Sequence, residues 1–392
     1  MTTVAVLVPP LHGHVNPALG TAAALARDGH RVVVHLPAEF RGAVGTAGAE
    51  LAELPPAPEP GWARDLDRLA RFASLPARLA EAARCVLPHV LDRLAADPPD
   101  VLAVDQLCVW GRLAAAVAGR PTVQLCTSYV PGPAWSPWAE PGFADLPDVP
   151  GAGAAWAAVD ELAAVHGTPR LTQADLLAGA GTRSVVYVPR ALHPAAAAYD
   201  DRHAFVGPAL RPEPAGPADR ALDDLDLAPG RPLVHVSMGT LFGDWSELGA
   251  LCEAAFADGA WDVVLAAPGA APTRRGAVRV RPSVPQLAVL RRASVAVTHA
   301  GMGSVLEALH AGVPLVAVPQ VPEQAITARR LAALGAAVHL DRDGVDAASL
   351  RSAVEHVATD PGVRRAVARL RHAVLAAGGA PAAARAVLAA AT

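Results

Sequence analysis

The sequence predicts an α/β protein built from two doubly wound, Rossmann-like domains. Three observations support this class. The chain has 392 residues, more than most single cores hold. Short apolar runs alternate with helical stretches in both halves, and a Pro-rich segment separates the halves. Because parallel strands need crossover helices, this alternation favours parallel sheets.

The first half opens with a β-α-β unit. The apolar run at 4–10 ends in Pro, which predicts a buried parallel strand followed by a loop. The next segment has helical composition and ends at Gly29, and a second strand is expected at 31–37. Further strands of this half are expected at 99–105, 121–127 and 183–192.

Residues 130–180 are less regular and rich in Pro and Gly, and they carry Trp135, Trp138 and Trp156. Long irregular segments in a compact domain are often functional loops or lids. Two interpretations stay open for these Trp residues: the wall of an acceptor site, or a packed loop.

The Pro-rich segment at 205–220 lacks hydrophobic periodicity and predicts an interdomain linker. The second half then repeats the β-α alternation, with strands expected at 232–240, 261–269, 278–282, 294–301 and 314–320. Two doubly wound domains place a ligand in the cleft between them, at the carboxyl ends of the strands. We expect a first Rossmann-like domain at 1–206, a linker at 207–220, a second Rossmann-like domain at 221–375, and a C-terminal helix at 376–392 that packs back on the first domain.

Composition excludes several classes of function. The net charge of −4 gives no electrostatic footprint for nucleic acid. No apolar run reaches the roughly 20 residues of a membrane span, and the first three residues lack the basic region of a signal peptide. None of the four cysteines forms a CxxC pair, so buried thiols in a reducing compartment are expected. We therefore expect a cytoplasmic protein without a membrane span.

The stretch SVAVTHAGMGSVLEALHAG at 294–312 reads as strand, tight turn and helix. Gly301 and Gly303 allow the backbone to approach a ligand closely. The helix start near Ser304 presents free N–H groups and the positive end of the helix dipole, which favours an anion such as phosphate. His299, at the end of the strand, can donate a further hydrogen bond to a phosphate oxygen.

Two further features of this half suit a sugar. Glu307 lies one turn into the helix, where a carboxylate can bind a pair of vicinal hydroxyls, as on a ribose. Glu323 and Gln324 follow the strand at 314–320, and a carboxylate beside an amide can accept from and donate to adjacent sugar hydroxyls. A Gly-rich turn with a solvated Glu is a common structural motif, but the three features together predict a site for an activated sugar.

A candidate base lies in the first half. Sugar transfer to an alcohol needs a base because a neutral hydroxyl is a weak nucleophile, and His is the usual base near neutral pH. The motif HGHVNP at 12–17 offers His12 and His14. Asp105 ends the strand at 99–105, and a carboxylate behind an imidazole fixes its tautomer and stabilises the imidazolium. No third ligand with suitable spacing favours a metal at His12 and His14.

From about 283 to 325 the sequence resembles the donor-binding signature of the family 1, GT-B glycosyltransferases, and especially the bacterial macrolide and flavonoid glucosyltransferases. The likeness extends to VSMGT at 236–240, HGHVNP at 12–17 and the tail at 375–388. It implies a GT-B fold, in which two Rossmann-like domains face each other across a cleft. In such a fold the domain at 1–206 would bind the acceptor and the domain at 221–375 the nucleotide sugar. The likeness also implies inverting, metal-independent hexosyl transfer.

The resemblance assigns roles to individual positions. It makes His14 the base, with Asp105 as its partner, and brings His299 to the donor diphosphate. It places Thr240, Gly303 and Ser304 near the phosphates, Gln286 near the nucleoside, Glu307 at the ribose, and Glu323 with Gln324 at the sugar hydroxyls. The expected donor-binding residues are Thr240, Ser283, Val284, Gln286, His299, Gly301, Gly303, Ser304, Glu307, Glu323 and Gln324.

The sequence departs from the family pattern at two positions. Ser283 stands where many relatives have a Trp stacked on uracil, so base recognition must use other groups, either Arg281 or the backbone around Val284. Gly303 stands where some relatives have Asn, which removes one side-chain donor. These departures leave the nucleotide open between uridine and thymidine.

We expect an inverting O-glycosyltransferase that moves a hexose from a nucleotide diphosphate sugar, with UDP-glucose favoured, to a hydroxyl of a lipophilic natural product such as a macrolide, polyketide or flavonoid. No cofactor beyond the nucleotide sugar and no metal are expected. The acidic run Asp223-Asp224-x-Asp226 is interpreted as a solvated patch near the linker, and His35, His235 and His339 as structural residues in or beside strands.

Four alternatives are considered. One is a glycosyltransferase of antibiotic biosynthesis that uses a TDP-deoxysugar, and another is a nucleotide-sugar-binding auxiliary protein that no longer transfers. A nicotinamide oxidoreductase needs GxGxxG after the first strand and an acid ending the second, and the segment at 12–20 and the strand at 31–37 have neither. A sugar epimerase would not need a large apolar acceptor site.

Overall fold

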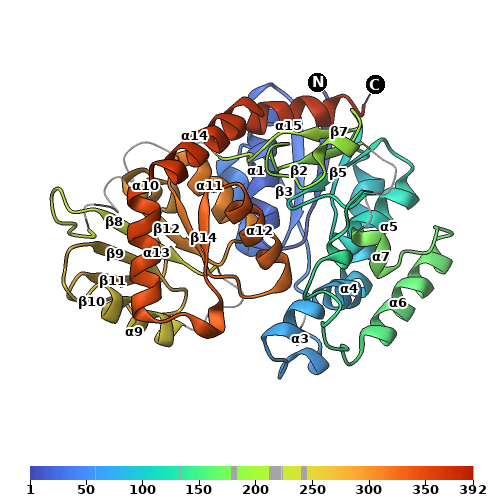
Figure 1. Cartoon of the computed structure of the whole chain (residues 1–392). Helices are drawn as coiled ribbons and strands as arrows, with labels where there is room; N and C mark the ends of the chain where they lie inside the picture. Colours follow the sequence, from blue (N-terminus) through green and yellow to red (C-terminus); the bar gives the residue numbers. More distant parts are fainter. Residues whose placement is uncertain are drawn as a thin grey trace. The chain divides into compact units, whose positions relative to one another are not determined.

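The computed structural model describes residues 1–57, 59–132, 134–177, 183–211, 222, 224–239 and 245–391. The chain divides into two compact units (Figure 1). Unit 1 is Met1–Arg211 with Ala377–Thr392, and unit 2 is Pro212–Ala376. Each unit contains a seven-stranded sheet with helices, which confirms the expected α/β class with two parallel-sheet domains.

The sheet of unit 1 has the order β3-β2-β1-β4-β5-β6-β7, and every neighbouring pair is parallel. The order reverses direction between β1 and β4, which makes this the topological switch point of the sheet. The strands are β1 (Thr3–Leu7), β2 (Arg31–Leu36), β3 (Glu50–Glu53), β4 (Val101–Asp105), β5 (Thr122–Cys126), β6 (Ser184–Val186) and β7 (His203–Phe205).

Helices cover both faces of this sheet. Val4 and Val6 of β1 pack into the core on one face, whereas Ala5 and Leu7 pack into the core on the other. This explains why β1 is an unbroken apolar run. One face is covered by α1 (His12–Arg27), α2 (Arg41–Thr46) and α15 (Gly379–Leu388), and the other by α4 (Leu75–Ala96), α5 (Val109–Ala118) and α6 (Ala152–Val165); the short helices α3 (Arg68–Ala73) and α7 (Gln173–Leu177) complete the unit.

Two details of unit 1 differ from the sequence-based expectations. Helix α1 begins at His12, so the motif HGHVNP forms its first turns instead of a loop, with Pro17 inside the helix. The segment 130–180, expected to be irregular, contains α6 and α7. Trp156 lies on α6 and packs against the core between α4 and α5, which favours the packing interpretation for this residue.

The C-terminal helix α15 belongs to unit 1 and packs against α1. Next to this contact, Gly20 of α1 lies so close to the chain at Ala209 that an added Cβ would be 1.9 Å from the Ala209 carbonyl oxygen. Gly20 is therefore required by the close approach of two backbone segments.

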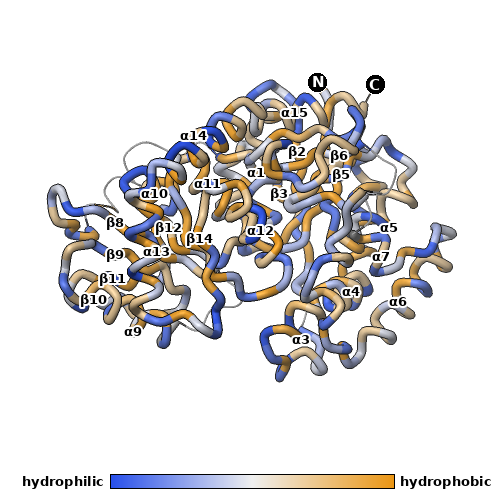
Figure 2. Tube along the Cα trace, in the orientation of Figure 1, coloured by the Kyte–Doolittle hydropathy of each residue, from blue (hydrophilic) through white to orange (hydrophobic). Residues whose placement is uncertain are grey.

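The sheet of unit 2 has the order β10-β11-β9-β8-β12-β13-β14. All pairs are parallel except β10 with β11. The strands are β8 (Leu233–Ser237), β9 (Asp262–Ala266), β10 (Thr273–Arg275), β11 (Val278–Arg281), β12 (Val295–Thr298), β13 (Leu315–Ala317) and β14 (Ala337–His339). The helices are α9 (Trp245–Ala255), α10 (Gln286–Arg292), α11 (Met302–Ala311), α12 (Pro322–Ala333), α13 (Ala347–Thr359) and α14 (Pro361–Ala376). Figure 2 shows hydrophilic and hydrophobic residues alternating along α14, whose apolar residues Val363, Val367 and Leu370 are buried.

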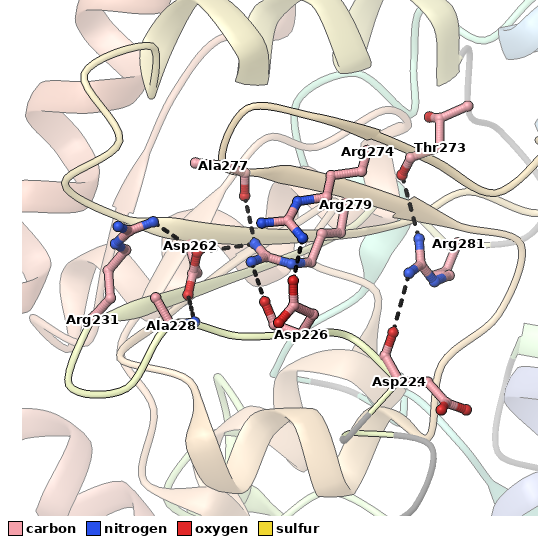
Figure 3. A network of polar contacts seen from close by, with 10 residues as sticks. All are labelled: Asp224, Asp226, Ala228, Arg231, Asp262, Thr273, Arg274, Ala277, Arg279 and Arg281. Carbon is pink, nitrogen blue, oxygen red and sulfur yellow. Dashed lines mark hydrogen bonds and ion pairs between the residues drawn. The ribbon is translucent and has the colours of Figure 1, made fainter.

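A buried ion pair fastens the start of unit 2 to one side of this sheet (Figure 3). Arg279 of β11 and Asp262 of β9 each have a side chain that is 1% exposed, and they lie 2.9 Å apart. Asp262 also accepts hydrogen bonds from the Ala228 N–H at 2.7 Å and from Arg231 at 3.3 Å. The carboxylate of Asp262 thus joins the segment around 228–231 to the start of β9.

The acidic segment before this contact has a structural role in addition to its solvated side chains. The Asp226 carbonyl accepts from Arg279, and its carboxylate pairs with Arg274 while remaining mostly exposed. Asp223 lies outside the described residues.

Candidate active site

The expected base and its partner meet in unit 1. His14 lies in the first turn of α1, directly after β1, and Asp105 is the last residue of β4. These two strands flank the switch point of the sheet. His14 Nδ1 is 2.9 Å from Asp105 Oδ2, which is a hydrogen-bond distance. His12, the other candidate, is exposed and lies edge-on against Phe40.

The surroundings of this pair orient the imidazole. Asp105 is fully buried, and its Oδ1 accepts the Leu107 N–H at 2.8 Å. Because a carboxylate only accepts hydrogen bonds, Nδ1 of His14 must carry the proton, and Nε2 carries the lone pair. The His14 side chain remains 15% exposed. The pair therefore has the geometry of a general base oriented by a buried carboxylate.

Thr127 is a third polar neighbour that sequence reasoning missed. It follows β5, and its Oγ1 lies 3.1 Å from His14 Nδ1. A lone Thr after a strand carries no motif, so only the packing of β5 beside β4 reveals this contact.

In unit 2, His299 is enclosed by two glycines. A Cβ at Gly301 would lie 2.2 Å from His299 Nε2, and one at Gly239 would lie 2.8 Å from the same atom. Ala300, between the histidine and the turn, has a φ of 63°, a left-handed conformation that is uncommon outside Gly. Burial lowers the pKa of His299 to about 4, with a hydrogen bond to the Ser237 backbone opposing the shift. The ring is therefore neutral near pH 7 and carries a single N–H.

The start of α11 lies next to His299. Its N-cap, Gly301, makes no side-chain capping hydrogen bond. Gly303 is exposed, and an added Cβ there would meet no atom within 4 Å. Ser304 is half-buried in the same turn. A helix start without a side-chain cap presents N–H groups and a positive dipole end, as an anion site requires.

Gln286 and Glu307 are brought together by α10 and α11. Gln286 Nε2 donates to Glu307 Oε2 at 2.5 Å, and Gln286 Oε1 lies 3.3 Å from Nε2 of His235. The side chains of Gln286 and Glu307 are half-buried. His235 lies within β8 and is 2% exposed. Sequence reasoning interpreted His235 as structural and missed its contact with Gln286.

Glu323 and Gln324 lie in the first turn of α12. Gln324 is buried, and its Oε1 accepts the Gln320 N–H at 2.8 Å. Gln320 is held in turn by Arg342, whose Nε donates to Gln320 Oε1 at 2.7 Å. Because the Gln324 carbonyl oxygen is engaged, the amide NH₂ is the group that can act as a further donor.

The remaining expected residues lie near the start of α10, or outside the described residues. Ser283 is exposed, and Val284 packs against the small apolar cluster beneath α10. The Arg281 guanidinium donates to the carbonyls of Thr273, Val280 and Asp224. Arg281 is one of the two groups considered for recognition of the nucleotide base, and its guanidinium is thus already bonded to backbone carbonyls. Thr240 lies outside the described residues.

The aromatic residues of the irregular segment form packed clusters. Trp135 lies edge-on against Tyr129 and donates to Glu140 at 2.8 Å. Trp138 is 41% exposed and lies edge-on against Phe143. Among the three Trp residues considered for an acceptor wall, Trp138 is thus the most open to a ligand.

Two features are absent from the described part of the chain. No group of three or more His, Cys, Asp or Glu side chains could hold a metal ion there. No helix in that part is long and apolar enough to cross a membrane.

The chain is similar in sequence to known proteins over nearly its whole length. Residues 267–388 match the family described as "Erythromycin biosynthesis protein CIII-like, C-terminal domain". The chain is 31% identical to NDP-glycosyltransferase YjiC of Bacillus licheniformis, over 96% of this chain and 94% of the relative. It is 33% identical to demethyllactenocin mycarosyltransferase of Streptomyces fradiae, over 97% of this chain and 84% of the relative.

Solved structures show the same fold over the whole chain. The glycosyltransferase of kitacinnamycin is 30% identical with a TM-score of 0.83, over 99% of both chains. CalG4, the calicheamicin glycosyltransferase, is 30% identical with a TM-score of 0.79, over 100% of this chain and 98% of the other.

The two parallel sheets, one in each unit, and the likeness to these enzymes over the whole chain define a GT-B sugar-transferring enzyme. The chain belongs to the family 1 GT-B glycosyltransferases, and it resembles the macrolide enzymes of that family. Enzymes of this family invert the anomeric centre and need no metal ion.

Proposed function

We propose that this enzyme transfers a hexose from a nucleotide diphosphate sugar, with UDP-glucose as the favoured donor, to a hydroxyl of a lipophilic natural product of the macrolide or polyketide kind. The observation that carries the proposal is the hydrogen bond between His14 and the buried Asp105. A protein that only bound nucleotide sugars would not need an oriented base.

The reaction begins at His14. Its Nε2 removes the proton from the acceptor hydroxyl, and that oxygen attacks the anomeric carbon from the face opposite the nucleotide. The bond from the anomeric carbon to the diphosphate breaks, and its electron pair leaves with the diphosphate. Asp105 stabilises the imidazolium that forms.

The diphosphate is assigned to the start of α11. Its negative charge grows as the bond breaks, and the N–H groups at Gly303 and Ser304 would stabilise it. Neutral His299 would add one hydrogen bond without adding charge, its single N–H exchanging the Ser237 backbone for a phosphate oxygen. In this proposal Glu307 binds the ribose, and Gln286 supports it.

The hexose is assigned to the start of α12. Glu323 would accept hydrogen bonds from sugar hydroxyls, whereas Gln324 would donate one through its NH₂ because its carbonyl is engaged by Gln320. This pairing suits a fully hydroxylated sugar, which favours glucose.

A TDP-deoxysugar donor is the second candidate. It is supported by the likeness to a mycarosyltransferase and by Ser283, which offers no aromatic ring to stack on uracil. The acceptor class rests on relatives named for demethyllactenocin and oleandomycin.

The test is a transfer assay with UDP-glucose, TDP-glucose and a TDP-deoxysugar against a panel of macrolides and phenols. Glycoside formed preferentially from UDP-glucose supports the main proposal. Preference for the deoxysugar supports the second. Tight donor binding without product from any pair, in the presence of intact His14, would contradict transferase activity on these acceptors.

A further inference from the structure

A line of hydrogen bonds runs from the core of unit 2 to Glu307. It begins at His235, on β8 at the centre of the sheet, where the side chain is 2% exposed. His235 Nε2 lies 3.3 Å from Gln286 Oε1. Gln286, the first residue of α10, then contacts Glu307 Oε2 on α11 at 2.5 Å. The proposed mechanism does not use His235.

The chemistry of the three groups fixes the direction of every hydrogen bond. An ionised Glu307 only accepts, so Gln286 must turn its NH₂ toward the carboxylate. The Gln286 carbonyl oxygen then faces His235, which must donate from Nε2. The other nitrogen of His235, Nδ1, is buried without a hydrogen-bond partner among the described residues, as a nitrogen without a proton can be. Burial lowers the pKa of His235, so the ring is neutral and carries this single proton.

The amide of Gln286 therefore has one permitted orientation. If it rotated by half a turn, its oxygen would face the Glu307 carboxylate and its NH₂ would face the Nε2–H of His235. Both contacts would be repulsive. If His235 could not donate, the carbonyl oxygen of the half-buried Gln286 would lose its hydrogen bond. An acceptor shielded from water and left without a partner is destabilising.

Building on the proposed role of Glu307 at the ribose, we propose that His235 is a positioning residue for nucleotide binding. Its Nε2–H holds the Gln286 amide, and the amide holds the carboxylate of Glu307 in the orientation that meets the ribose hydroxyls. His235 itself touches no substrate. Its contribution is to restrict two flexible side chains before the donor binds.

The test uses the ribose hydroxyls as a probe. UDP has two of them and 2′,3′-dideoxy-UDP has none, so the ratio of their dissociation constants reports the contacts made by Glu307. His235→Phe keeps an aromatic ring in the core and removes the donor. We expect the preference for UDP to fall about tenfold, KM for the donor to rise by a similar factor, and kcat at saturating donor to stay within about twofold.

Three further variants separate positioning from general damage. His235→Gln retains an N–H donor and is expected to recover part of the preference for UDP. Gln286→Met interrupts the line outside the core strand and should reproduce the loss, even if His235→Phe folds poorly. His35→Phe is the matched control, because His35 is also a buried strand histidine with an unpartnered Nδ1, but it lies in unit 1. It should leave the preference unchanged.

Two results would overturn the inference in different ways. If Glu307→Gln removes the preference for UDP while His235→Phe and Gln286→Met keep it, His235 does not position the site. If the wild-type enzyme binds both nucleotides equally, or Glu307→Gln leaves the preference intact, then the proposed ribose role of Glu307 fails, and the role of His235 fails with it.

Discussion

At the scale of single residues, the candidate site depends on side chains that burial and hydrogen bonds hold in place. Asp105 is buried and accepts from a backbone N–H as well as from His14. His299 is neutral because burial lowers its pKa to about 4. Asp105 thus lies buried behind the candidate base, and His299 is a neutral ring beside the start of α11.

The glycines around His299 give a steric prediction. In Gly301→Ala the new Cβ would lie 2.2 Å from His299 Nε2, so the imidazole must move. We expect the dissociation constant for UDP to rise at least about tenfold, measured by calorimetry. Gly249→Ala on α9 is the control, since a Cβ there meets no atom within 4 Å. Equal UDP affinity in both variants would show that the position of His299 does not matter for the donor.

Buried histidines also predict how stability depends on pH. The pKa of His35 and that of His299 are both lowered to about 4 by burial, from an ordinary value of 6.5. Between pH 6.5 and 4 the unfolded chain binds these protons and the folded chain does not. The free energy of unfolding should therefore fall as the pH drops through this range, by up to about 1.4 kcal/mol per pH unit for each histidine.

Urea denaturation at pH 7.5, 6.0 and 5.0 measures this slope. His35→Phe removes one of the two groups and should make the slope shallower than in the wild type, because unfolding then takes up one proton fewer. A variant slope equal to that of the wild type would mean that His35 titrates normally in the folded protein.

At the scale of elements, each unit has its own stabilising contacts. Unit 1 has a close approach between backbone segments, and unit 2 has a buried ion pair. In unit 1, α1 carries the candidate base and packs against α15. In unit 2, Arg279 and Asp262 join β11 to β9 and to the segment leading into the sheet. These contacts lie away from the candidate site residues and support the elements that carry them.

Gly20→Ala tests the packing of α1. Ala is normally the better helix residue by about 1 kcal/mol, yet here its Cβ would lie 1.9 Å from the Ala209 carbonyl oxygen. Because that oxygen belongs to the backbone, the clash should outweigh the gain in helix propensity. We expect a lower thermal midpoint than in the wild type. A raised midpoint would contradict the close approach of α1 and the chain at Ala209.

Arg279→Met tests the ion pair. It leaves the carboxylate of Asp262 buried at 1% exposure without its main cation. Loss of one partner of a buried pair typically costs about 3–5 kcal/mol. The double variant Arg279→Met with Asp262→Leu should recover part of this loss, because it also removes the unpaired charge. Denaturation of the single and double variants measures the coupling, and strictly additive losses would contradict it.

At the scale of the whole molecule, the sequence was enough to predict the class of fold and the family. The strands that the sequence predicts at 4–10, 31–37 and 99–105 are buried apolar runs, and periodicity detects such runs. The short strands β3, β7 and β10 were missed, and β14 was indicated only by the interpretation of His339 as a residue in or beside a strand. The strand β10 has the sequence TRR and is fully exposed, so pairing with β11 defines it rather than its own composition.

The residues of the candidate site also divide into those that the sequence predicts and those that only the structure shows. His14, His299, Glu307 and Gln324 stand in motifs that the sequence makes visible, and their functional roles remain predictions. Single polar residues such as Thr127 and His235 stand in no motif. They join the site only through the packing of neighbouring strands and helices, which local sequence does not encode.

The central claim is that His14, oriented by Asp105, is the base of an inverting sugar transfer. The most direct test measures single-turnover transfer from the preferred donor for wild type, His14→Ala and Asp105→Asn, with the UDP dissociation constant measured in parallel. We predict a rate loss of about 10²–10⁴-fold in both variants with unchanged UDP affinity, because only proton removal is impaired. Transfer by His14→Ala at the wild-type rate would contradict the claim and place the base elsewhere.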